Sequence, residues 1–487
     1  MEGFGELKTV SNDEWTCVKG QWRNGSLNGL ASMEYRSLDS SGSLYEGYYE
    51  DNKPEGHGAL RTVESLFVGE WKKGVKNGYG VLEKSRTKYL GMWEGDLPNG
   101  IGVLVTLDGV CCRGSFVKDS FRAAVYFPSG ECLSGSFYGR IQDSVQITSG
   151  CLQKCSAESI VADEVTFPSA DMKWSDVFRH AYDLLGQSSI EECDTDKAWE
   201  SLAAYCGKIQ CSSPAEKGAL LKENLETDIM YKILDYNAPF NEAYFSMVKA
   251  YCKLAFCSTY HPLGRLKNGL VDVFNLSYSG TGVHRCLLLD AIQEAKSIFL
   301  RFYKYVRILF PSLPSQSDMN NLVSEIDHTT PILSWSLETF SSFICGSILQ
   351  SIYPNLFTLY VIKNEDSDKV YQSNIRHVNS KSDVLLLDHL GVDREFWPVV
   401  FIDTADLDKP SCVSENCENV VACPWTADNL VPITTYVLIR AQIQRLGAEL
   451  NFIRDFAPSL DDAGEIQYMF TTLQCCYQFL VQSKNIG

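Results

Sequence analysis

The sequence predicts a multidomain protein in which an N-terminal all-β repeat array is followed by an all-α helical bundle. Two observations support this fold class. The pattern aromatic-x-Gly-x-aromatic recurs about every 22 residues, at Tyr45–Tyr49, Phe67–Trp71 and Tyr89–Trp93, and such a period is typical of stacked supersecondary units. From about residue 170 onward, apolar residues instead recur three and four positions apart, which is the spacing of amphipathic helices.

Each repeat predicts a hairpin of two short strands. The large rings occupy alternate positions, so they share one face of a sheet, and a polar turn leads into the second strand. A Gly-x-Gly pair in that strand permits tight turns and close backbone approach. The three pairs are Gly56/Gly58, Gly78/Gly80 and Gly100/Gly102. Because one hairpin cannot bury its rings alone, neighbouring repeats must stack into a continuous core.

These residues resemble MORN repeats (membrane occupation and recognition nexus), whose pattern is Tyr-x-Gly-x-Trp, a turn and Gly-x-Gly. The clear copies cover residues 45–66, 67–88 and 89–111. Degenerate copies, in which the glycine pair is weakened or lost, lie near residues 18–30, 112–132 and 133–140. We therefore assign residues 1–140 to the repeat array.

Composition narrows the classes of function. The chain has 487 residues and a formal net charge of −18, which argues against nucleic acid as a partner because phosphate binding needs a dense basic surface. A run of about 18 apolar residues is absent, so no membrane-spanning helix is expected. The N-terminus lacks the basic-then-apolar order of a secretory signal. The 18 cysteines include no Cys-x-x-Cys pair, so we expect free thiols, no metal site and a cytoplasmic protein.

The rest of the chain divides into three predicted parts. Residues 141–198 form a connector, residues 199–339 a helical region and residues 340–485 a second helical domain. Within this last domain we expect one helix at 336–353 and a second at 355–363, with a break at Pro354 between them. Because helices can bury their own apolar faces, we expect the part from about Trp199 to fold without the repeats.

The candidate site residues lie near the end of the sequence. Asp428 opens a predicted helix, and Tyr468 and Thr471 lie three apart in another, so their hydroxyls share one helix face. No histidine follows His389 and no nucleophile–base pair can be assembled there, which excludes a hydrolase arrangement. Taken singly, Asp428 has the simpler interpretation of a helix N-cap, and the two hydroxyls that of interfacial polar groups.

The joint order and spacing of several residues in this region resemble the vacuolar protein sorting 9 domain. The residues that carry the resemblance are Ala427-Asp428-x-x-x-Pro432, Leu446, Phe452-Ile453-x-x-Phe456 and Gly464-Glu465-x-x-Tyr468-x-x-Thr471. The similarity covers about residues 340–481, and one departure is Ile466-Gln467, where the family often has Asp-Gly. The order of MORN repeats, helical region and this domain resembles the C-terminal portion of the alsin family.

The resemblance implies an all-helical guanine-nucleotide exchange factor for early-endosomal (Rab-five subfamily) small GTPases, acting in vesicle-mediated transport and endocytosis. The residues implied to act in nucleotide release are Asp428, Tyr468 and Thr471, and those implied to bind the GTPase are Pro432, Gly464 and Glu465. Neither a cofactor nor covalent chemistry is implied, because the Mg²⁺ belongs to the GTPase substrate.

Further expectations concern partners and location. The alternative to an exchange factor is a non-catalytic Rab-binding or oligomerising scaffold. We expect the repeats to mediate homo-oligomerisation because the array ends in unpaired hairpins. The basic cluster Lys72, Lys73 and Lys76 leaves peripheral membrane association as the other interpretation. The expected location is the cytoplasm, with recruitment to early endosomes or vesicles.

Overall fold

A computed structural model describes most of the chain, in two compact units, Met1–Leu356 and Phe357–Gly487. The residues it describes are 2–11, 14–37, 42–117, 120–129, 131–138, 149–155, 173–187, 194–210, 236–258, 261–314, 331–397, 426–457 and 464–482. Most of the predicted connector lies outside these residues.

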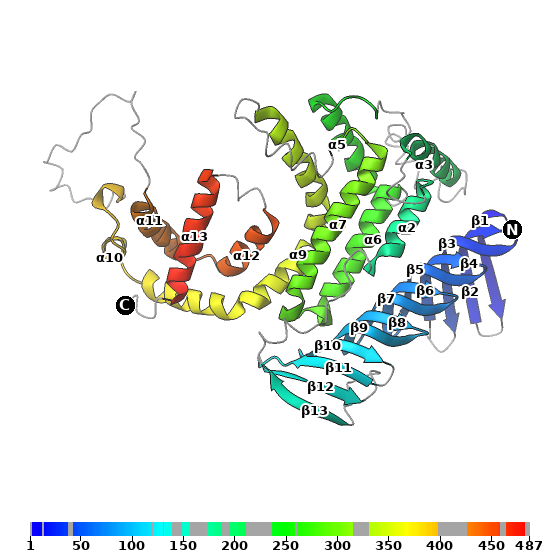
Figure 1. The fold of residues 1–487 in the computed structure, drawn as a ribbon, viewed down its shortest axis with the longest axis horizontal. Helices are drawn as coiled ribbons and strands as arrows, with labels where there is room; N and C mark the ends of the chain where they lie inside the picture. The colour runs from blue at the N-terminus through cyan, green and yellow to red at the C-terminus, as the bar shows by residue number, and fades with distance from the viewer. Residues whose placement is uncertain are drawn as a thin grey trace. The chain divides into compact units, whose positions relative to one another are not determined.

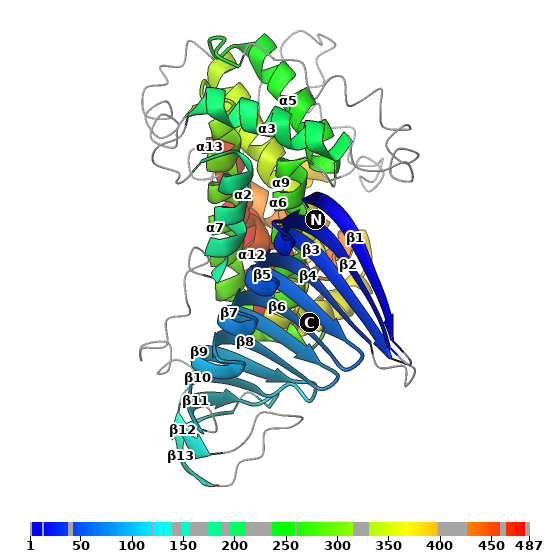
Figure 2. The ribbon, with the colours of Figure 1, turned by 90° about the vertical axis from the view of Figure 1, so that its right-hand side faces the viewer.

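The repeats form one antiparallel sheet of thirteen strands whose spatial order is the order of the sequence (Figures 1 and 2). The strands are β1 (Gly3–Ser11), β2 (Glu14–Arg23), β3 (Ser26–Ser37), β4 (Gly42–Glu50), β5 (Lys53–Thr62), β6 (Ser65–Lys72), β7 (Val75–Lys84), β8 (Thr87–Glu94), β9 (Leu97–Thr106), β10 (Cys111–Val117), β11 (Ser120–Tyr126), β12 (Cys132–Tyr138) and β13 (Ser149–Cys155). The predicted N-terminal all-β array is confirmed.

The glycines of the repeat motif allow neighbouring strands to approach closely. A Cβ added to Gly69 in β6 would lie 2.5 Å from the Cα of its partner Gly80 in β7. The register of these two strands shifts between Gly69 and Trp71, and the equivalent shift recurs two strands earlier and two strands later. Each shift is a bulge, which bends the strand and re-aims the following aromatic ring.

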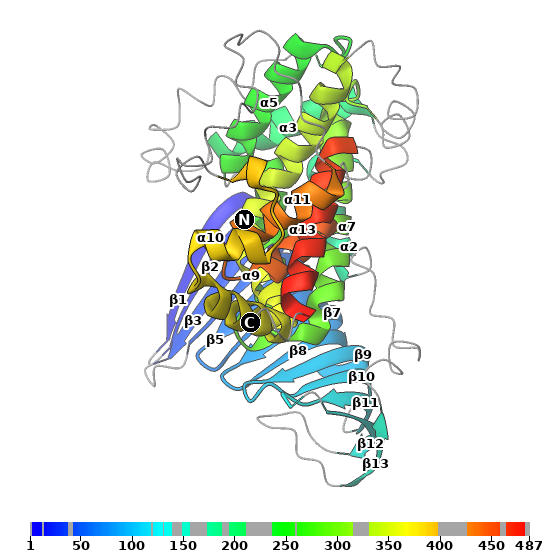
Figure 3. The same cartoon turned by 90° about the vertical axis from the view of Figure 1, so that its left-hand side faces the viewer.

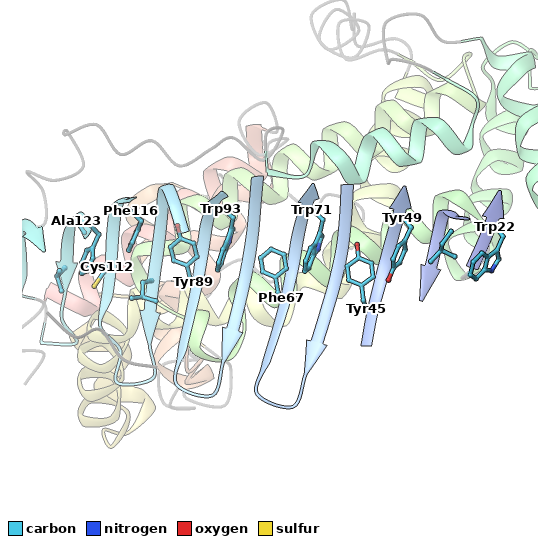
Figure 4. Packing of buried hydrophobic residues seen from close by; sticks show 14 residues of the cluster. Trp22, Tyr45, Tyr49, Phe67, Trp71, Tyr89, Trp93, Cys112, Phe116 and Ala123 are labelled. Carbon is cyan, nitrogen blue, oxygen red and sulfur yellow. The ribbon is translucent and has the colours of Figure 1, made fainter. Parts of the chain in front are cut away.

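One face of the sheet carries a row of aromatic rings that pack edge to face along the array (Figure 4). The indole N–H of Trp71 donates to the carbonyl of Gly58 at 3.1 Å, and that of Trp93 donates to Gly80 at 3.2 Å. Trp22 makes the same bond to Gly5 at 3.3 Å, so β1 continues the register of the repeats. The row is therefore both apolar and hydrogen-bonded between successive repeats.

The turns at one end of the hairpins are also joined from repeat to repeat. Asn52 adopts a left-handed φ of 63° and its side-chain oxygen accepts from the backbone N–H of Leu27 at 2.7 Å. Asp96, with φ of 68°, accepts from the N–H of Lys76 at 2.9 Å in the same way. Asn and Asp tolerate this backbone region better than other residues with a side chain, which explains their presence in the turns.

The described elements that follow β13 are all helical, as predicted. In the first unit they are α2 (Ser175–Leu184), α3 (Thr195–Gln210), α5 (Glu242–Cys257), α6 (Pro262–Tyr278), α7 (Leu288–Leu309) and the short 3-10 helices η1 (Gly280–Gly282) and η2 (Arg285–Leu287). The long helix α9 (Pro331–Asn379) begins in this unit.

The predicted break at Pro354 is wrong, because α9 runs through this residue. A proline inside a helix removes one backbone hydrogen bond and costs about 3 kcal/mol. Ile348, Ile352 and Leu356 lie four residues apart on one helix face and are fully buried. Burying each of these side chains contributes about 1.5–3 kcal/mol, which outweighs the loss at the proline.

The second face of the sheet packs against helices of the same unit. Side chains alternate between the two faces of a strand, so Lys88 lies on the face opposite Tyr89 of the aromatic row. On this second face, Tyr79 contacts Trp174, which precedes α2, edge to face with ring centroids 5.2 Å apart. The sheet thus covers the start of α2.

Glu294 of α7 connects the helices at this contact. Its side chain is 1% exposed, and it accepts a hydrogen bond from the indole N–H of Trp174 at 2.7 Å. Its other carboxylate oxygen pairs with the ammonium of Lys173 at 3.0 Å and accepts from the hydroxyl of Tyr278 at 2.8 Å. One buried positive charge and two further donors compensate the buried carboxylate, which would otherwise be strongly destabilising.

Two basic side chains of the sheet bind the helices directly. The ammonium of Lys88, which is fully buried, donates to the carbonyls of Leu276 and Ser279, both at 2.6 Å. These carbonyls lie at the C-terminal end of α6, where a positive charge is favourable. The guanidinium of Arg113 forms a bidentate pair with Asp290 of α7, at 2.7 and 3.1 Å. Because of these contacts we now expect the helices to depend on the sheet, in place of the expectation that they fold without the repeats from about Trp199; the truncation described in the Discussion tests this.

We predict a pH-dependent stability of the junction between the sheet and α2, centred on Glu70 of β6. Burial raises the pKa of Glu70 to about 7, and repulsion from Asp176 adds to the shift. Because the unfolded carboxyl ionises first, the stability contributed by Glu70 falls as pH rises from about 4.5 to about 7. The variant Glu70→Gln should therefore be more stable than the wild type at pH 8, by about 2–3 kcal/mol, and equally stable below pH 4.5.

The quantity to compare is the difference in unfolding free energy between Glu70→Gln and the wild type at each pH. The buried histidines change the stability of both proteins with pH, in the direction opposite to Glu70. Burial lowers the pKa of His57, which faces Glu70 across the β5–β6 pair, to about 4, and that of His180 in α2 to about 3. Their contribution is present above pH 6.5 and is lost as pH falls. Arg179 and Glu55 are the other charged groups near Asp176. Urea unfolding between pH 4.5 and 8 measures the difference; the exposed Glu46→Gln is the control and should show none.

The second unit is built from the remainder of α9 and from α10 (Asp383–His389), η3 (Arg394–Phe396), α11 (Ala427–Ala441), α12 (Leu446–Phe456) and α13 (Gly464–Gln482) (Figures 1 and 3). Its core gathers apolar residues from α9, α10, α11, α12 and α13. The buried members are Tyr371, Ile375, Val378, Leu386, Leu438, Ile439, Leu446, Leu450, Cys476, Tyr477 and Leu480.

Candidate functional site

The predicted site begins at the N-terminus of α11. Thr426 is the N-cap residue, with extended φ and ψ of −90° and 160°, and its carbonyl accepts from the N–H of Leu430 at 2.9 Å. Asp428 lies one residue further in, in the first turn, and is exposed. The simpler interpretation of Asp428 as the N-cap is therefore wrong. Its carboxylate is placed at the positive end of the helix dipole without serving as the cap.

Pro432 lies inside α11 and is half-buried. As a proline it cannot donate the backbone hydrogen bond that the carbonyl of Asp428, four residues earlier, would otherwise accept. Pro432 is the sixth residue of α11, past the first turn, so the helix lacks an internal hydrogen bond there. The backbone beside Asp428 is consequently less fully bonded than in a regular helix.

The remaining predicted residues lie at the start of α13. Gly464 is its first residue, with φ of 29°, and Glu465 is its second. Tyr468 is 40% exposed and Thr471 is exposed, so the expected shared face of the two hydroxyls is open to solvent. Behind them, the buried Thr472 donates to the carbonyl of Tyr468 at 2.9 Å.

Helices α11 and α13 pack against each other and share the core of the second unit. The thiol of Cys476 in α13 contacts the carbonyl of Val431 in α11 at 3.5 Å, and Thr435 donates to the same carbonyl at 2.8 Å. Val431 is three residues after Asp428, and Cys476 is five residues after Thr471. The structure thus places the predicted residues on two helices fixed to one another.

Helix α11 is also held at its other end. The hydroxyl of Tyr436 donates to Asp383 of α10 at 2.9 Å, and Arg440 forms an ion pair with the same carboxylate at 2.6 Å. Arg440 further donates to the carbonyl of Asn379 at 2.8 Å. Burial raises the pKa of Tyr436, and the hydrogen bond to Asp383 adds to the shift, so this hydroxyl remains a donor at neutral pH.

Sequence reasoning missed the apolar residues that flank Tyr468. Ile466 is 60% exposed and Met469 is 46% exposed, and at about 100° per residue both lie on a different side of α13 from Tyr468 and Thr471. In the sequence these residues continue the apolar spacing of Phe470 and Leu473, so they are indistinguishable from core positions. The start of α13 therefore exposes apolar side chains as well as hydroxyls.

The site has the chemistry of a binding surface. Within the described ranges, no group of His, Cys, Asp and Glu side chains is placed to hold a metal ion. Across the same ranges, no helix is both long and apolar enough to cross a membrane. The arrangement offers an exposed carboxylate, two exposed hydroxyls and two exposed apolar side chains, which can bind a partner without covalent chemistry.

Three family models match the chain, in the order that the fold shows. The MORN repeat matches residues 19–40, 45–61, 67–85 and 89–110. The helical array domain of Alsin matches residues 236–341, and the vacuolar sorting protein 9 domain matches residues 408–485. The first repeat match confirms the degenerate copy near residues 18–30. Each candidate site residue falls inside the last match.

Curated relatives align with the chain along its length. Alsin from Mus musculus is 27% identical over 583 residues, covering 100% of this chain and 35% of the relative. The ALS2 C-terminal-like protein from Bos taurus is 26% identical over 570 residues, covering 98% of this chain and 57% of the relative. An Alsin homolog from Drosophila melanogaster is 26% identical over 263 residues, covering 47% of this chain and 17% of the relative. The chain thus spans about a third of the length of Alsin.

Proposed function

We propose that this chain, which carries MORN repeats and a vacuolar sorting protein 9 domain and is homologous throughout to proteins named Alsin, is a guanine-nucleotide exchange factor for small GTPases. We assign the early-endosomal, Rab-five subfamily as its substrate. One observation carries the proposal. The domain match at 408–485 coincides with helices α11 and α13, whose exposed Asp428, Tyr468 and Thr471 fit the residues expected to drive nucleotide release.

Asp428 supplies the negative charge that displaces the nucleotide. A small GTPase holds GDP through backbone amides, a lysine and Mg²⁺ on its phosphates. An incoming carboxylate binds the lysine and repels the phosphates, so the Mg²⁺ and GDP leave more easily. A thousandfold faster release requires a barrier lower by only about 4 kcal/mol. One charge repulsion and a few hydrogen bonds in a partly desolvated interface reach that magnitude.

The other residues bind the GTPase and orient it. The hydroxyls of Tyr468 and Thr471 hydrogen-bond the segments that change conformation with the nucleotide, and the exposed Ile466 and Met469 offer apolar contact area on the same helix. Pro432 shapes the surface next to Asp428. Gly464 and Glu465 begin α13 and contact the GTPase at its end.

The deciding experiment is the release of fluorescent GDP from purified small GTPases on addition of the full-length chain. Release from Rab-five subfamily members should accelerate at least about a hundredfold and saturate with chain concentration, while Rab GTPases of other subfamilies respond less. Saturable binding of the GTPase without acceleration would replace this proposal with the scaffold alternative. Acceleration of a different subfamily would retain the activity and change the substrate.

We propose in addition that the repeats mediate homo-oligomerisation, because β1 is an edge strand of the sheet that the described residues form. Leu7 and Val10 of this strand are exposed, on opposite faces of the sheet. The alternative, lipid binding by Lys72, Lys73 and Lys76, is weakened because the Lys76 ammonium lies over the Phe67 and Trp93 rings, 5.0 and 5.3 Å from their centroids.

Static light scattering should therefore give a mass of at least twice 54.6 kDa for the full-length chain. A proline within β1, Lys8→Pro, should lower that mass to one chain, because proline removes a backbone donor and disfavours strand pairing at the edge. Thr9→Ala is the matched control and should keep the larger mass. A monomeric wild type would remove this role.

In cells, we propose that the chain is cytoplasmic and is recruited to early endosomes by its GTPase. The location of a fluorescent fusion, compared with and without that GTPase, would test this.

A further inference from the structure

One buried carboxylate oxygen joins three helices of the second unit. Asp368 of α9 is 6% exposed, and its Oδ1 accepts from the backbone N–H of Gly447 in α12 at 2.8 Å. The same oxygen accepts from the hydroxyl of Tyr477 in α13 at 2.8 Å. Oδ2 has no hydrogen-bond partner among the described residues. The whole connection therefore depends on a single acceptor atom.

The geometry requires a glycine at position 447. A Cβ there would lie 2.2 Å from the hydroxyl oxygen of Tyr477 and 2.7 Å from Oδ1 of Asp368, well inside contact distance. Gly447 is the second residue of α12, so the carboxylate also lies at the positive end of that helix. Tyr371 of α9 belongs to the same core. Burial raises its pKa to about 12 and the carboxylate of Asp368 adds to the shift, so the Tyr371 hydroxyl stays protonated at neutral pH.

Tyr477 determines how α13 is rotated about its own axis. It lies nine residues after Tyr468, which at about 100° per residue places the two side chains on opposite sides of the helix. A bond that fixes Tyr477 toward α9 therefore turns Tyr468 toward solvent. Asn374 of α9 supports this orientation by donating to the carbonyl of Leu480 at 2.7 Å.

We propose that Asp368 is a positioning residue for the exchange site, holding α13 in the rotation that presents Tyr468 and Thr471 to the GTPase and fixing the start of α12 beside it. The inference rests on the proposed function. It assigns a role in exchange to a residue that precedes the matched domain at 408–485 and does not touch the GTPase.

The test is the rate of GDP release by the full-length chain, measured over a range of chain concentrations so that kcat and the half-saturating concentration separate. Tyr477→Phe removes one hydroxyl and keeps the ring, and should lower kcat about tenfold; Asp368→Leu should lower it about a hundredfold, because small displacements of reacting groups have effects of that size. Asp368→Asn keeps an acceptor oxygen and should retain kcat within about threefold. The double variant of Tyr477→Phe and Asp368→Leu should be no slower than Asp368→Leu alone.

The matched control is Tyr360→Phe. The hydroxyl of Tyr360 donates to Asp455 of α12 at 2.7 Å, so this variant removes an equivalent bond from α9 without releasing α13. Its kcat should equal that of the wild type. If Asp368→Leu does not fold, Tyr477→Phe decides alone, at a temperature where circular dichroism shows native helix content.

Different results would overturn the proposed exchange activity and the positioning role of Asp368. If the wild type accelerates no GTPase, the proposed function is overturned and the inference with it. If the wild type is active while Tyr477→Phe keeps the wild-type kcat, or if Tyr360→Phe loses as much as Tyr477→Phe, the inference alone is overturned.

Discussion

Replacing Asp428 by Asn is expected to reduce catalysed GDP release at least about a hundredfold, which corresponds to about 3 kcal/mol in the barrier. The substitution removes the negative charge that competes for the GTPase lysine and repels the phosphates, but keeps the size of the side chain. Because Thr426 is the N-cap, the helix itself should lose only the interaction of a first-turn carboxylate with its dipole, about 0.3–1 kcal/mol. Fluorescent GDP release and thermal unfolding measure the two effects.

Glu449→Gln provides the matched control for that variant. Glu449 is the acidic residue in the first turn of α12, so its substitution removes the same kind of helix-dipole interaction from the same unit. Exchange by Glu449→Gln should equal that of the wild type. Wild-type release rates in Asp428→Asn would show that the carboxylate has no part in exchange, even if the chain proves to be an exchange factor.

Removing the whole sheet is expected to unfold the helices that it covers. A chain beginning at Lys173 lacks β1 to β13 and should lose cooperative thermal unfolding and bind a hydrophobic dye. The sheet buries Trp174 through Tyr79, and Arg113 compensates the charge of Asp290. Breaking one buried ion pair of this kind already costs about 3–5 kcal/mol, a large part of the total stability of a domain.

A shorter truncation separates this effect from a general loss of the repeats. A chain beginning at Gly42 lacks β1, β2 and β3 but keeps the strands whose contacts with the helices are described above. Because each repeat packs mainly on its neighbours, this chain should unfold cooperatively. If the chain beginning at Lys173 also unfolds cooperatively, the helices are an independent domain and the contacts with the sheet are dispensable.

The repeat array could be predicted from sequence because its interactions are local. The aromatic row, the glycine pairs and the turns all connect residues within one or two repeats. The repeat period is therefore sufficient to predict the sheet. The contacts of Lys88 and Arg113 could not be predicted, because their partners lie 188 and 177 residues away. In the sequence each is one basic residue in a strand, and surface exposure is the ordinary expectation for it.

One feature of the candidate site was predictable for a different reason. Tyr468 and Thr471 share a face wherever the helix is placed, but the exposure of that face follows only from the tertiary structure. The assignment of the N-cap was harder, because Thr426 and Asp428 are both good capping residues and lie two positions apart. Asp368 gave no signal, since a lone Asp among Glu365, Asp366 and Lys369 is typical of a solvated helix surface. Only the tertiary fold places it against Gly447 and Tyr477.

The turn-to-turn bonds restrict how the array can change in length during evolution. Each turn depends on the next one along, as Leu27 depends on Asn52 and Lys76 on Asp96. An insertion of one residue within a strand would move the later rings of that strand to the other face and shift its turn away from its partner. Gain or loss of one entire period of about 22 residues preserves both relations. Duplication and deletion in this part of the gene are therefore expected to survive selection only in whole repeats.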